Sequence, residues 1–396
     1  MSRSTDVAVI GGGAIGAAIT YYLAKENIDA ILVEKGDIAH GTTSKCDGNV
    51  LVHDKIPGFD SRLAKLSQDL FPEITNEIDY DFNWVQKGSL LIIESEEELE
   101  AAAKFCQSMK EEGLPVRILD QYEVHQDEPK LAKDIIGGLE TQCDGSLDPM
   151  ALAYGLVHGA KKLGAQIDTY NAVKNIQVNS LKKDFKIISE RGEINAKRIV
   201  NAAGVWTPEI GKMVGLDIPI LPRQGQILVA ERTVPVARRK VVEFGYLMAK
   251  FEGGNYKRNV TPEMEKYGIA FVFEPTHADN FLIGSSRQFV GMNTFCDIEV
   301  LKALAQRARR FFPVIGDINI ITSYAGLRPY TPDHLPIISE TEIPDFYVAS
   351  GHEGDGIGLS LITGKLITQM ICSKTLDIDI ERIRLNRFNS KNRNVN

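Results

Sequence analysis

The stretch "DVAVIGGGAIGAAITYYLAKENIDAILVEKG", residues 6–36, decides the fold of the N-terminal part of the chain. It opens with a short apolar run that has the composition of a buried strand, and glycines follow that run directly. A helical stretch and a second apolar run, which ends near residue 35, come next. We therefore predict a strand, a glycine turn, a helix and a second strand, in this order.

Three glycines of this turn have the spacing of a dinucleotide-binding motif. Gly11, Gly13 and Gly16 form the pattern G-x-G-x-x-G between the first strand and the helix. The first permits a tight turn, the second lets the backbone approach a pyrophosphate, and the third lets the helix pack on the strand. Glu34 ends the second strand, where its carboxylate would accept hydrogen bonds from the ribose hydroxyls of an adenosine. The same charge would repel a 2′-phosphate, which disfavours NADP.

Two further stretches favour FAD over NAD. A NAD domain would continue with more parallel strand–helix units, but residues 36–51, "GDIAHGTTSKCDGNVL", form a loop rich in glycine and hydroxyl side chains. Its hydroxyls and amides suit a second length of pyrophosphate. Residues 199–211, "IVNAAGVWTPEIG", form a strand that ends in small residues, so the backbone can pass close to a cofactor. The alternative is that both stretches are ordinary packing turns.

The 396 residues are too many for one small core, and they predict two domains that are interleaved in sequence. We expect an α/β (α+β) fold with a Rossmann-like FAD-binding domain and a substrate domain built on a mixed or antiparallel sheet. The expected division is 1–75, 140–220 and 322–385 for the FAD-binding domain, 76–139 and 221–321 for the substrate-binding domain, and 386–396 for a frayed tail. One strand is expected at 166–178, and the glycine-rich segment 245–268 is expected to be a lid.

Composition narrows the class of protein further. The net charge of −8 argues against nucleic acid as a partner, and no apolar run approaches the ~20 residues of a membrane span. The first strand begins at Asp6, which leaves no room for a signal peptide. The five cysteines are scattered and lack any C-x-x-C pair, which is typical of a reduced cytoplasm and predicts no zinc or iron–sulfur site from this chain alone. We expect a cytoplasmic protein without a metal.

An ordered set of segments resembles a known family. These segments are "VIGGGAIGAAITYYLAKEN", "DPMALAYGLVHGAKKLGAQI", "VNAAGVW", "PRQGQILV", "FLIGSS", "GLRPYTPDHLPII" and "GHEGDGIGLSLITGKLI". In this order the chain resembles, essentially from end to end, the FAD-dependent amino-acid and amine oxidoreductases of the D-amino-acid oxidase group. That group includes glycine oxidase, sarcosine oxidase and the β subunits of proline, hydroxyproline and opine dehydrogenases.

The resemblance and the glycine motif together imply the residues that contact FAD. Val173 would meet the adenine through its backbone, and the "GHEGDGIG" loop would lie beside the flavin ring, where N–H groups and a helix N-terminus stabilise the charge of the reduced flavin. The full set of expected cofactor residues is Gly11, Gly13, Ala14, Ile15, Gly16, Glu34, Lys35, Thr42, Thr43, Ser44, Gly48, Asn49, Val173, Ala203, Gly204, Gly351, His352, Glu353, Gly354, Asp355, Gly356 and Ile357.

Arg328 is the expected substrate residue. It stands in "YAGLRPYTPDHLPII", an otherwise apolar stretch, and a buried guanidinium without an anion costs several kcal/mol. The resemblance implies that Arg328 grips the substrate carboxylate, for which a planar fork is better suited than a lysine. The alternative is a structural ion pair with Asp333. His352 is the second expected catalytic residue. Tyr246, Tyr256 and His53 are candidate pocket residues as well, but for each of them a packing or surface position is the expectation.

Two positions depart from the patterns of particular relatives. Glycine oxidase-like sequences carry an arginine where this chain has Gly354, which weakens a specific glycine oxidase assignment. Monomeric sarcosine oxidases attach the flavin to a cysteine at the place of Gly326, so covalent attachment there is excluded. We therefore expect noncovalent FAD.

The resemblance implies oxidation of an amino acid or secondary amine, such as proline, hydroxyproline, sarcosine or an opine, by hydride transfer to flavin N5. "GHEGDGIGLS" and "IGSSRQFVG" are closest to the β subunits of heteromeric dehydrogenases, which implies partner subunits with an iron–sulfur or second flavin relay. The alternatives are a free-standing oxidase of the glycine or sarcosine type that forms hydrogen peroxide and, more remotely, a flavin-binding scaffold without catalysis or a NAD-dependent dehydrogenase.

Overall fold

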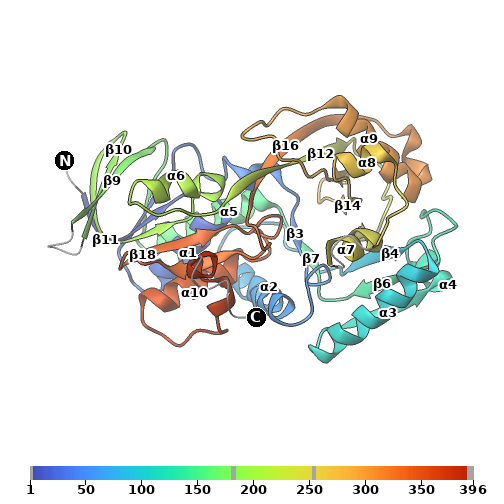
Figure 1. Cartoon of the computed structure of the whole chain (residues 1–396), viewed down its shortest axis with the longest axis horizontal. Coiled ribbons are helices and arrows are strands. Elements are labelled where there is room, and N and C mark those ends of the chain that lie inside the picture. Colours follow the sequence, from blue (N-terminus) through green and yellow to red (C-terminus); the bar gives the residue numbers. More distant parts are fainter. Residues whose placement is uncertain (1–2, 180–183, 252–255, 390–396) are drawn as a thin grey trace.

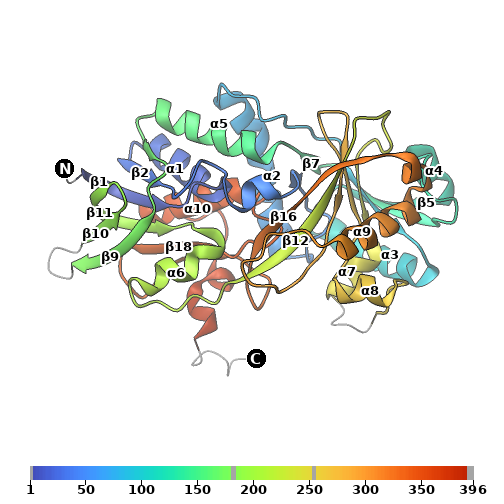
Figure 2. The ribbon, with the colours of Figure 1, turned by 90° about the horizontal axis from the view of Figure 1, so that it is seen from above.

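The computed structural model describes residues 3–179, 184–251 and 256–389. Figures 1 and 2 show two parts, each built around a sheet, that lie side by side along the long axis of the molecule. N-terminal and C-terminal strands share the first sheet, whereas the second sheet comes from the middle of the chain and from β16 (Ile320–Tyr330). The predicted fold class, a Rossmann-like parallel sheet combined with a mixed antiparallel sheet, is confirmed.

The first sheet has a parallel centre. Its strand order is β17 (Ile337–Glu340), β18 (Phe346–Ser350), β11 (Gly192–Asn201), β1 (Arg3–Ile10), β2 (Ala30–Val33) and β8 (Gln166–Asp168). All neighbours in this order are parallel except β17 and β18. The four residues of β2 are all buried, as expected for a strand with both faces covered.

Helices cover one face of this sheet. These helices are α1 (Ala14–Lys25), α2 (Phe59–Glu77), α5 (Pro149–Lys162) and α10 (Ser360–Ile371), and they lie close together in Figure 1. α1 is almost wholly buried between α5 and α10, and a Cβ on Gly364 would lie 2.7 Å from the backbone of Ala18. Only a glycine lets α10 approach α1 so closely.

The other face carries an antiparallel extension of the sheet. β9 (Val173–Asn179) pairs with β10 (Asp184–Ser189), which pairs with β11, and α6 (Thr207–Lys212) lies nearby. The single strand expected at 166–178 was therefore wrong. Tyr170 has φ 52°, in the left-handed region, so the chain turns there and β8 and β9 pair with different neighbours.

The second sheet is mixed. Its order is β16, β12 (Leu221–Ala230), β15 (Phe281–Gly284), β14 (Val272–Pro275), β13 (Lys240–Glu243), β4 (Ser89–Ile93), β6 (Gly137–Thr141) and β5 (Val116–Asp120). β13 and β4 are parallel and the other neighbours are antiparallel. Around it lie α3 (Glu96–Glu111), α4 (Gln121–Asp127), α7 (Phe244–Phe251), α8 (Pro262–Lys266) and α9 (Ile298–Phe311). β3 (Asn49–Val50) and β7 (Gly145–Ser146) form a separate two-stranded ladder.

Local sequence signals explain where several of these helices begin. Ser95 and Asp297 cap α3 and α9 by accepting a hydrogen bond from a backbone N–H of the first turn. Asp148 does the same for α5, and Pro149 follows at the first helical position, where its missing N–H is not needed. These signals are local, because each depends only on residues next to the start of its helix.

The stretch around Arg328, the expected lid and the expected tail can be compared with the structure. Arg328 lies in a strand, because β16 pairs with β12 up to Tyr330. The domain boundary expected at 322 therefore falls within a strand of the second sheet. The described part of the expected lid consists of α7, α8 and their flanks, and 252–255 lie outside the described residues. Of the expected tail, Arg387 pairs with Asp333 at 2.6 Å, and 390–396 lie outside the described residues.

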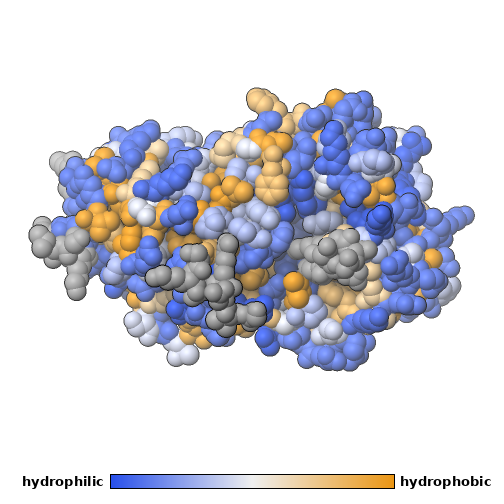
Figure 3. All heavy atoms as spheres, viewed as in Figure 1, coloured by the Kyte–Doolittle hydropathy of each residue, from blue (hydrophilic) through white to orange (hydrophobic). Residues whose placement is uncertain are grey.

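The surface differs between the two parts. In Figure 3 hydrophilic side chains dominate the part that holds the second sheet, and apolar side chains gather toward the middle and the first sheet. Among the helices of the described ranges, none has the length and apolar character needed to cross a membrane.

Candidate functional site

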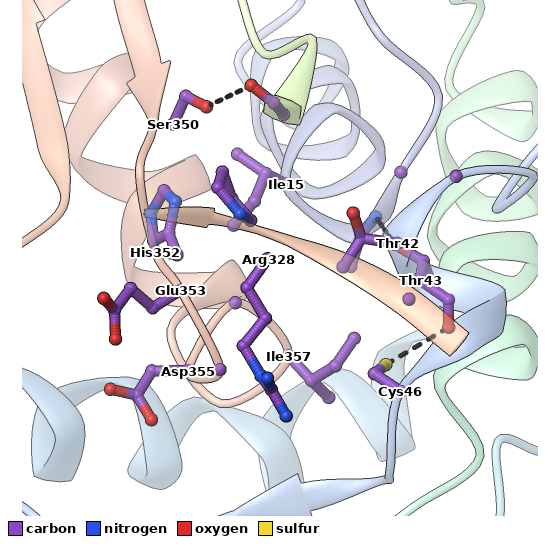
Figure 4. Close-up of a pocket in the computed structure, with 18 of the residues that line it drawn as sticks. Ile15, Thr42, Thr43, Cys46, Arg328, Ser350, His352, Glu353, Asp355 and Ile357 are labelled. Atoms are coloured by element: carbon purple, nitrogen blue, oxygen red, sulfur yellow. Dashed lines mark hydrogen bonds between the residues drawn. The ribbon is translucent and has the colours of Figure 1, made fainter. Parts of the chain in front are cut away.

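A cavity of about 460 Å³ lies where the two sheets meet. The carboxyl ends of β1, β2, β11 and β18 open into it, and β12, β13 and β16 contribute further wall. Ligands of doubly wound sheets bind beyond the carboxyl ends of the strands, and this volume is in the usual range of ligand sites. Figure 4 shows part of the lining, and this cavity is the candidate functional site.

The glycine turn forms one end of the cavity. Gly11 has φ 117°, and a Cβ there would lie 2.4 Å from the Ala202 carbonyl oxygen, so no other residue fits. Gly13 is the N-cap residue of α1, and no side chain there accepts a hydrogen bond from the first N–H groups of the helix. A helix end of this kind attracts an anion, which suits the pyrophosphate of a dinucleotide.

Glu34 and Lys35 follow β2 and also line the cavity. The Glu34 carboxylate accepts hydrogen bonds from the N–H groups of Gly12 at 2.6 Å and Gly36 at 2.8 Å. These bonds fix its orientation and leave lone pairs for a ligand hydroxyl. The Lys35 ammonium lies 3.1 Å from the centroid of the Trp206 ring, and burial lowers the pKa of this ammonium.

The segment 42–49 connects the glycine turn to the second sheet. The Thr43 hydroxyl accepts a hydrogen bond from the Ala14 N–H at 3.1 Å, and the Thr42 hydroxyl donates one to the Leu327 carbonyl at 2.6 Å. Asn49 lines the cavity, and its Oδ1 is buried without a hydrogen-bond partner in the protein. A buried acceptor without a partner is costly, so it indicates a donor supplied by a ligand. The glycine turn, the uncapped helix and this acceptor fit a dinucleotide cofactor.

The loop between β18 and α10 forms the next wall. Glu353 binds Arg223 at 2.8 Å, so these two charges neutralise each other. Asp355 binds Lys55 at 2.9 Å, and opposite charges raise the pKa of this buried lysine against the effect of burial. The acidic side chains of the loop are therefore held in ion pairs, and the glycines between them leave backbone N–H groups beside the cavity.

His352 is buried and neutral. Its Nε2 lies 3.0 Å from the Thr363 hydroxyl, which itself donates to the Leu359 carbonyl at 2.7 Å. The hydroxyl proton is thus committed, so Nε2–H must be the donor and Nδ1 carries the lone pair. Burial lowers the pKa of His352 to about 3. His352 lines the cavity as a fixed neutral side chain.

Arg328 extends from β16 into the cavity between Glu353 and Asp355 on one side and Ile357 and Cys46 on the other (Figure 4). Its Nη1 donates to the Ser286 carbonyl at 2.9 Å and its Nη2 to the Ser285 hydroxyl at 2.8 Å. Burial and the neighbouring Arg287 and Arg223 lower the pKa of Arg328 to about 10.

No carboxylate of the described residues forms an ion pair with Arg328, and Asp333, the expected alternative partner, binds Arg387 instead. The alternative of an ion pair with Asp333 was therefore wrong. The Arg328 guanidinium remains charged at neutral pH and faces the cavity without an ion-pair partner among the described residues, which is the arrangement that a ligand carboxylate would complete.

Most of the expected site residues come together. Those that line the cavity are Gly11, Gly13, Ala14, Ile15, Glu34, Lys35, Thr42, Thr43, Asn49, Val173, Ala203, Gly204, Arg328, His352, Glu353, Gly354, Asp355, Gly356 and Ile357. Gly16, Ser44, Gly48 and Gly351 are not brought to the wall. A Cβ on Gly16 would lie 1.9 Å from the Gly11 oxygen, so Gly16 serves packing, and the Gly48 N–H donates to Glu274 at 3.0 Å. The Ser44 hydroxyl binds local carbonyls, and Gly351 packs against Thr331.

Several cavity residues were missed from sequence. They include Asp47, Gly225, Lys240, Tyr246 and Arg287. Gly225 and Arg287 stand within the quoted segments "PRQGQILV" and "IGSSRQFVG", but nothing local in these segments shows that their strands face Arg328. Tyr246 was expected to be a packing residue, whereas the structure places it in the wall. Tyr256, by contrast, binds Glu98 at 2.8 Å, and His53 is buried with Ser89 and Asp144.

Comparison with known proteins places this site in context. The family model described as FAD dependent oxidoreductase (DAO) matches residues 6–370. Glycine oxidase from Geobacillus kaustophilus is 27% identical, with 99% of both chains covered, and the crystal structure of glycine oxidase from that organism superposes with a TM-score of 0.86 over 97% of this chain and 99% of the other. Hydrogen cyanide synthase subunit HcnC from Pseudomonas aeruginosa is 25% identical over 98% of this chain and 97% of its own length. The structure of L-proline dehydrogenase from P. horikoshii has a TM-score of 0.86 at 22% identity, with 98% of both chains covered, and shows the shared fold.

Proposed function

Because the chain belongs to the DAO family of FAD dependent oxidoreductases, we propose that it oxidises an amino acid or a secondary amine that carries a carboxylate. The observation that carries this proposal is Arg328. Its half-buried guanidinium faces the cavity without an ion-pair partner among the described residues. The relatives named glycine oxidase and D-amino acid dehydrogenase support a substrate of this class.

Bound FAD supplies a two-electron acceptor whose N5 takes a hydride, so the substrate carbon that bears the amine becomes the carbon of an imine. The residues of the chain orient this carbon. Arg328 would hold the carboxylate, and Ser285 and Ser286 fix the guanidinium from behind. The neutral His352 cannot supply a charge, so in this proposal its part is to shape the wall beside the loop 351–359.

We propose that FAD is held without a covalent bond. Gly326 carries no side chain that could be attached, and a Cβ there would lie 2.4 Å from the Lys45 carbonyl. Cys46 lines the cavity, but burial raises the pKa of its thiol well above the usual value, so the thiolate is scarce. Acid precipitation of the yellow protein should leave the colour in the supernatant; a yellow pellet would contradict the noncovalent proposal.

We further propose that the chain is the catalytic subunit of a dehydrogenase and passes electrons to partner subunits with their own redox groups. HcnC, a relative along the whole chain, is named as a subunit of a synthase. The second candidate is a free-standing oxidase, which the glycine oxidase relatives favour. A cytoplasmic location belongs to the same proposal, since all five cysteines are free.

An anaerobic titration near 450 nm tests the proposed function. Glycine, sarcosine, L- and D-proline, hydroxyprolines and N-carboxyalkyl amino acids are added to the wild type and to Arg328→Gln. We expect bleaching of the wild type by at least one compound and a loss of affinity of at least tenfold in Arg328→Gln. Arg232→Gln, which removes an exposed arginine paired with Asp279, is the matched control and should behave as wild type.

The same samples distinguish the two candidates. Rapid return of the colour in air with hydrogen peroxide indicates an oxidase, whereas return only with an artificial acceptor indicates a dehydrogenase. If no compound bleaches the flavin of the wild type, oxidation of a carboxylate-bearing amine by this chain alone is contradicted.

A further inference from the structure

A second arginine lines the cavity beside Arg328. Arg287 follows β15 and reaches the same wall as Tyr246, Ser285 and Arg328. A single substrate carboxylate needs one guanidinium fork, and Arg328 already provides it. Arg287 is therefore a charge that the proposed function does not use.

The contacts of Arg287 hold it in place without neutralising it. Its guanidinium lies 4.0 Å from the centroid of the Tyr246 ring. Nη1 makes long contacts to the carbonyls of Gly268 at 3.4 Å and Ser285 at 3.3 Å. Within the described residues no carboxylate lies within ion-pair distance of Arg287, and no partner is seen for its Nε and Nη2. The side chain is thus positioned on an aromatic face with donors to spare.

Arg223, the third arginine of this wall, behaves differently. It pairs with Glu353 at 2.8 Å, and the side chains of both residues are nearly buried. Among the described residues, Arg223 is thus neutralised by an acid, whereas Arg287 and Arg328 form no ion pair. The Arg287 charge lowers the pKa of Arg328 more than the Arg223 charge does, so the guanidinium groups of Arg287 and Arg328 are close enough to repel each other.

The remaining charges of the cavity do not cancel these two. Asp47, Glu34 and Glu209 are acids of the wall that form no ion pair within the described residues, and of these Asp47 lies close enough to Arg328 to raise the pKa of that arginine. Lys240, buried and also in the wall, adds a positive charge near Glu274. Burial and the Asp47 charge raise the pKa of Glu274 to about 8, so this acid does not offset the lysine at neutral pH. The wall carries more positive than negative charge, which a substrate with one carboxylate and one ammonium group would leave unbalanced.

We propose that the substrate is an amino dicarboxylate, in which Arg328 binds the carboxylate next to the reacting carbon and Arg287 binds the second carboxylate. This inference rests on the proposed function and narrows its substrate class. Asp47 would face the amine between the two carboxylates. Proline, sarcosine and glycine, which carry one carboxylate, would then be weak substrates at best.

Inert ligands test the second anion site separately from catalysis. Diglycolate and methoxyacetate are ethers of nearly the same shape, with two carboxylates and one, and neither has an amine to oxidise. Glutarate and butyrate form a second such pair. Their binding to the FAD-loaded protein is measured by isothermal titration calorimetry at low and at high salt, for wild type, Arg287→Gln, Arg287→Lys and Arg328→Gln.

We expect at least one dicarboxylate to bind at least tenfold more tightly than its monocarboxylate partner, with a preference that falls at high salt. Arg287→Gln should remove this preference and change monocarboxylate binding by no more than about twofold, a level within the usual scatter of single measurements. Arg287→Lys should retain part of the preference for dicarboxylates. Arg328→Gln should weaken the binding of both ligands in each pair. Unchanged FAD content and melting temperature of Arg287→Gln show that the variant is folded. If it is not folded, the results for Arg287→Lys and the salt dependence decide whether Arg287 binds the second carboxylate.

Three other results are distinguishable from these. If monocarboxylates bind as tightly as dicarboxylates and Arg328→Gln removes both, the second anion site is overturned while the proposed function stands. If a dicarboxylate preference exists but survives Arg287→Gln, Arg287 is not the site. If no carboxylate binds and no amino acid bleaches the flavin, the proposed function itself fails, and this inference fails with it.

Discussion

A glycine on the neighbouring strand makes room for the Arg328 guanidinium. A Cβ on Gly225 would lie 2.3 Å from both Nη1 and Nη2 of Arg328, far closer than any real contact. Gly225→Ala should therefore push the guanidinium off Ser285 and Ser286 and weaken ligand carboxylate binding by about tenfold, or ~1.4 kcal/mol, with FAD still bound. The measurement is the dissociation constant of a carboxylate ligand.

Gly354→Ala is the matched control for this substitution. Gly354 also lies beside Arg328, but a Cβ there would be 3.7 Å from Nε, an ordinary van der Waals distance. Ligand affinity of Gly354→Ala should stay within about twofold of wild type. Equal effects of the two alanines would show that the space beside Arg328 is not what positions it.

His352 gives a second prediction at the scale of one residue. Burial holds its pKa at about 3 in the folded protein, whereas an unfolded histidine has its ordinary value near 6.5. Below pH 6.5 only the unfolded state binds the proton, so His352 lowers stability as the pH falls, by at most about 1.4 kcal/mol per pH unit. His352→Gln keeps a donor to Thr363 and does not titrate.

We expect the melting temperature of wild type to fall more steeply than that of His352→Gln between pH 6.5 and 5, and the two to be parallel above pH 7. Differential scanning calorimetry across this range checks it. Parallel curves down to pH 5 would mean that His352 is not held neutral by burial.

Single residues also show what the sequence can reveal about the site. The glycine motif and Glu34 could be predicted because one short segment supplies both the turn and the acid. Arg328 stood out because a charge in an apolar stretch needs a reason. Nothing comparable marks Arg287 or Asp47, whose place in the wall depends on how distant strands pair.

At the scale of elements, β14 holds the 42–49 segment through one buried acid. Glu274 accepts a hydrogen bond from the Gly48 N–H, and its raised pKa, about 8, comes from burial first and from Asp47 second. Between the ordinary value of about 4.5 and pH 8 the unfolded carboxyl is ionised while the folded one stays protonated. The folded state therefore loses stability as the pH rises through this window, and the loss is complete above pH 8.

Glu274→Gln keeps the acceptor for Gly48 and removes the titration. We expect the fall in melting temperature from pH 5 to pH 8 to shrink by at least about 2 °C in this variant, the shift that ~1 kcal/mol causes in a large domain. Glu231→Gln, which changes a half-buried acid directly after β12, serves as the comparison and should retain the slope of wild type. A slope unchanged in Glu274→Gln would contradict a protonated Glu274.

The limits of prediction at this scale have a physical cause. The first strand–helix–strand unit and the capped helices depend on neighbouring residues and could be predicted from them. β8 and β9 could not be separated, because a single left-handed residue, Tyr170, divides an otherwise continuous strand-like run. β16 could not be recognised from sequence as a strand that continues to Tyr330, because Pro329 lies within it and prolines are rare inside sheets; Pro329 pairs with Pro222 of β12, where neither needs to donate.

At the scale of the whole molecule, the cavity joins two sheets whose segments alternate along the chain. Its wall takes Gly11 and Ser350 from the ends of first-sheet strands, and Lys240 and Arg328 from the second sheet. A hydrogen bond from the Thr42 hydroxyl to the Leu327 carbonyl connects the 42–49 segment directly to β16. A ligand that fills such a cavity stabilises both parts at once, because either part loses wall contacts when the other unfolds.

FAD should therefore raise the stability of the entire chain. At a free FAD concentration of about 100 times Kd the gain is ~2.7 kcal/mol, and we expect the apoprotein to melt several degrees lower than the FAD-loaded protein in one transition. Calorimetry with and without FAD, together with hydrogen exchange of β11 and β13, measures this. Asn49→Ala, which removes the unpartnered acceptor, should reduce the shift by weakening FAD binding.

Hydrogen exchange decides between a joint and a one-sided effect. If FAD slows exchange at the end of β11 and in β13 alike, the cofactor links the two sheets into one cooperative unit. Protection confined to β11, or two separate melting transitions of which FAD moves one, would mean that the second sheet folds and moves independently. Arg328 would then be carried toward and away from the cofactor with β16, and substrate affinity would depend on the packing of the two parts as well as on the arginine itself.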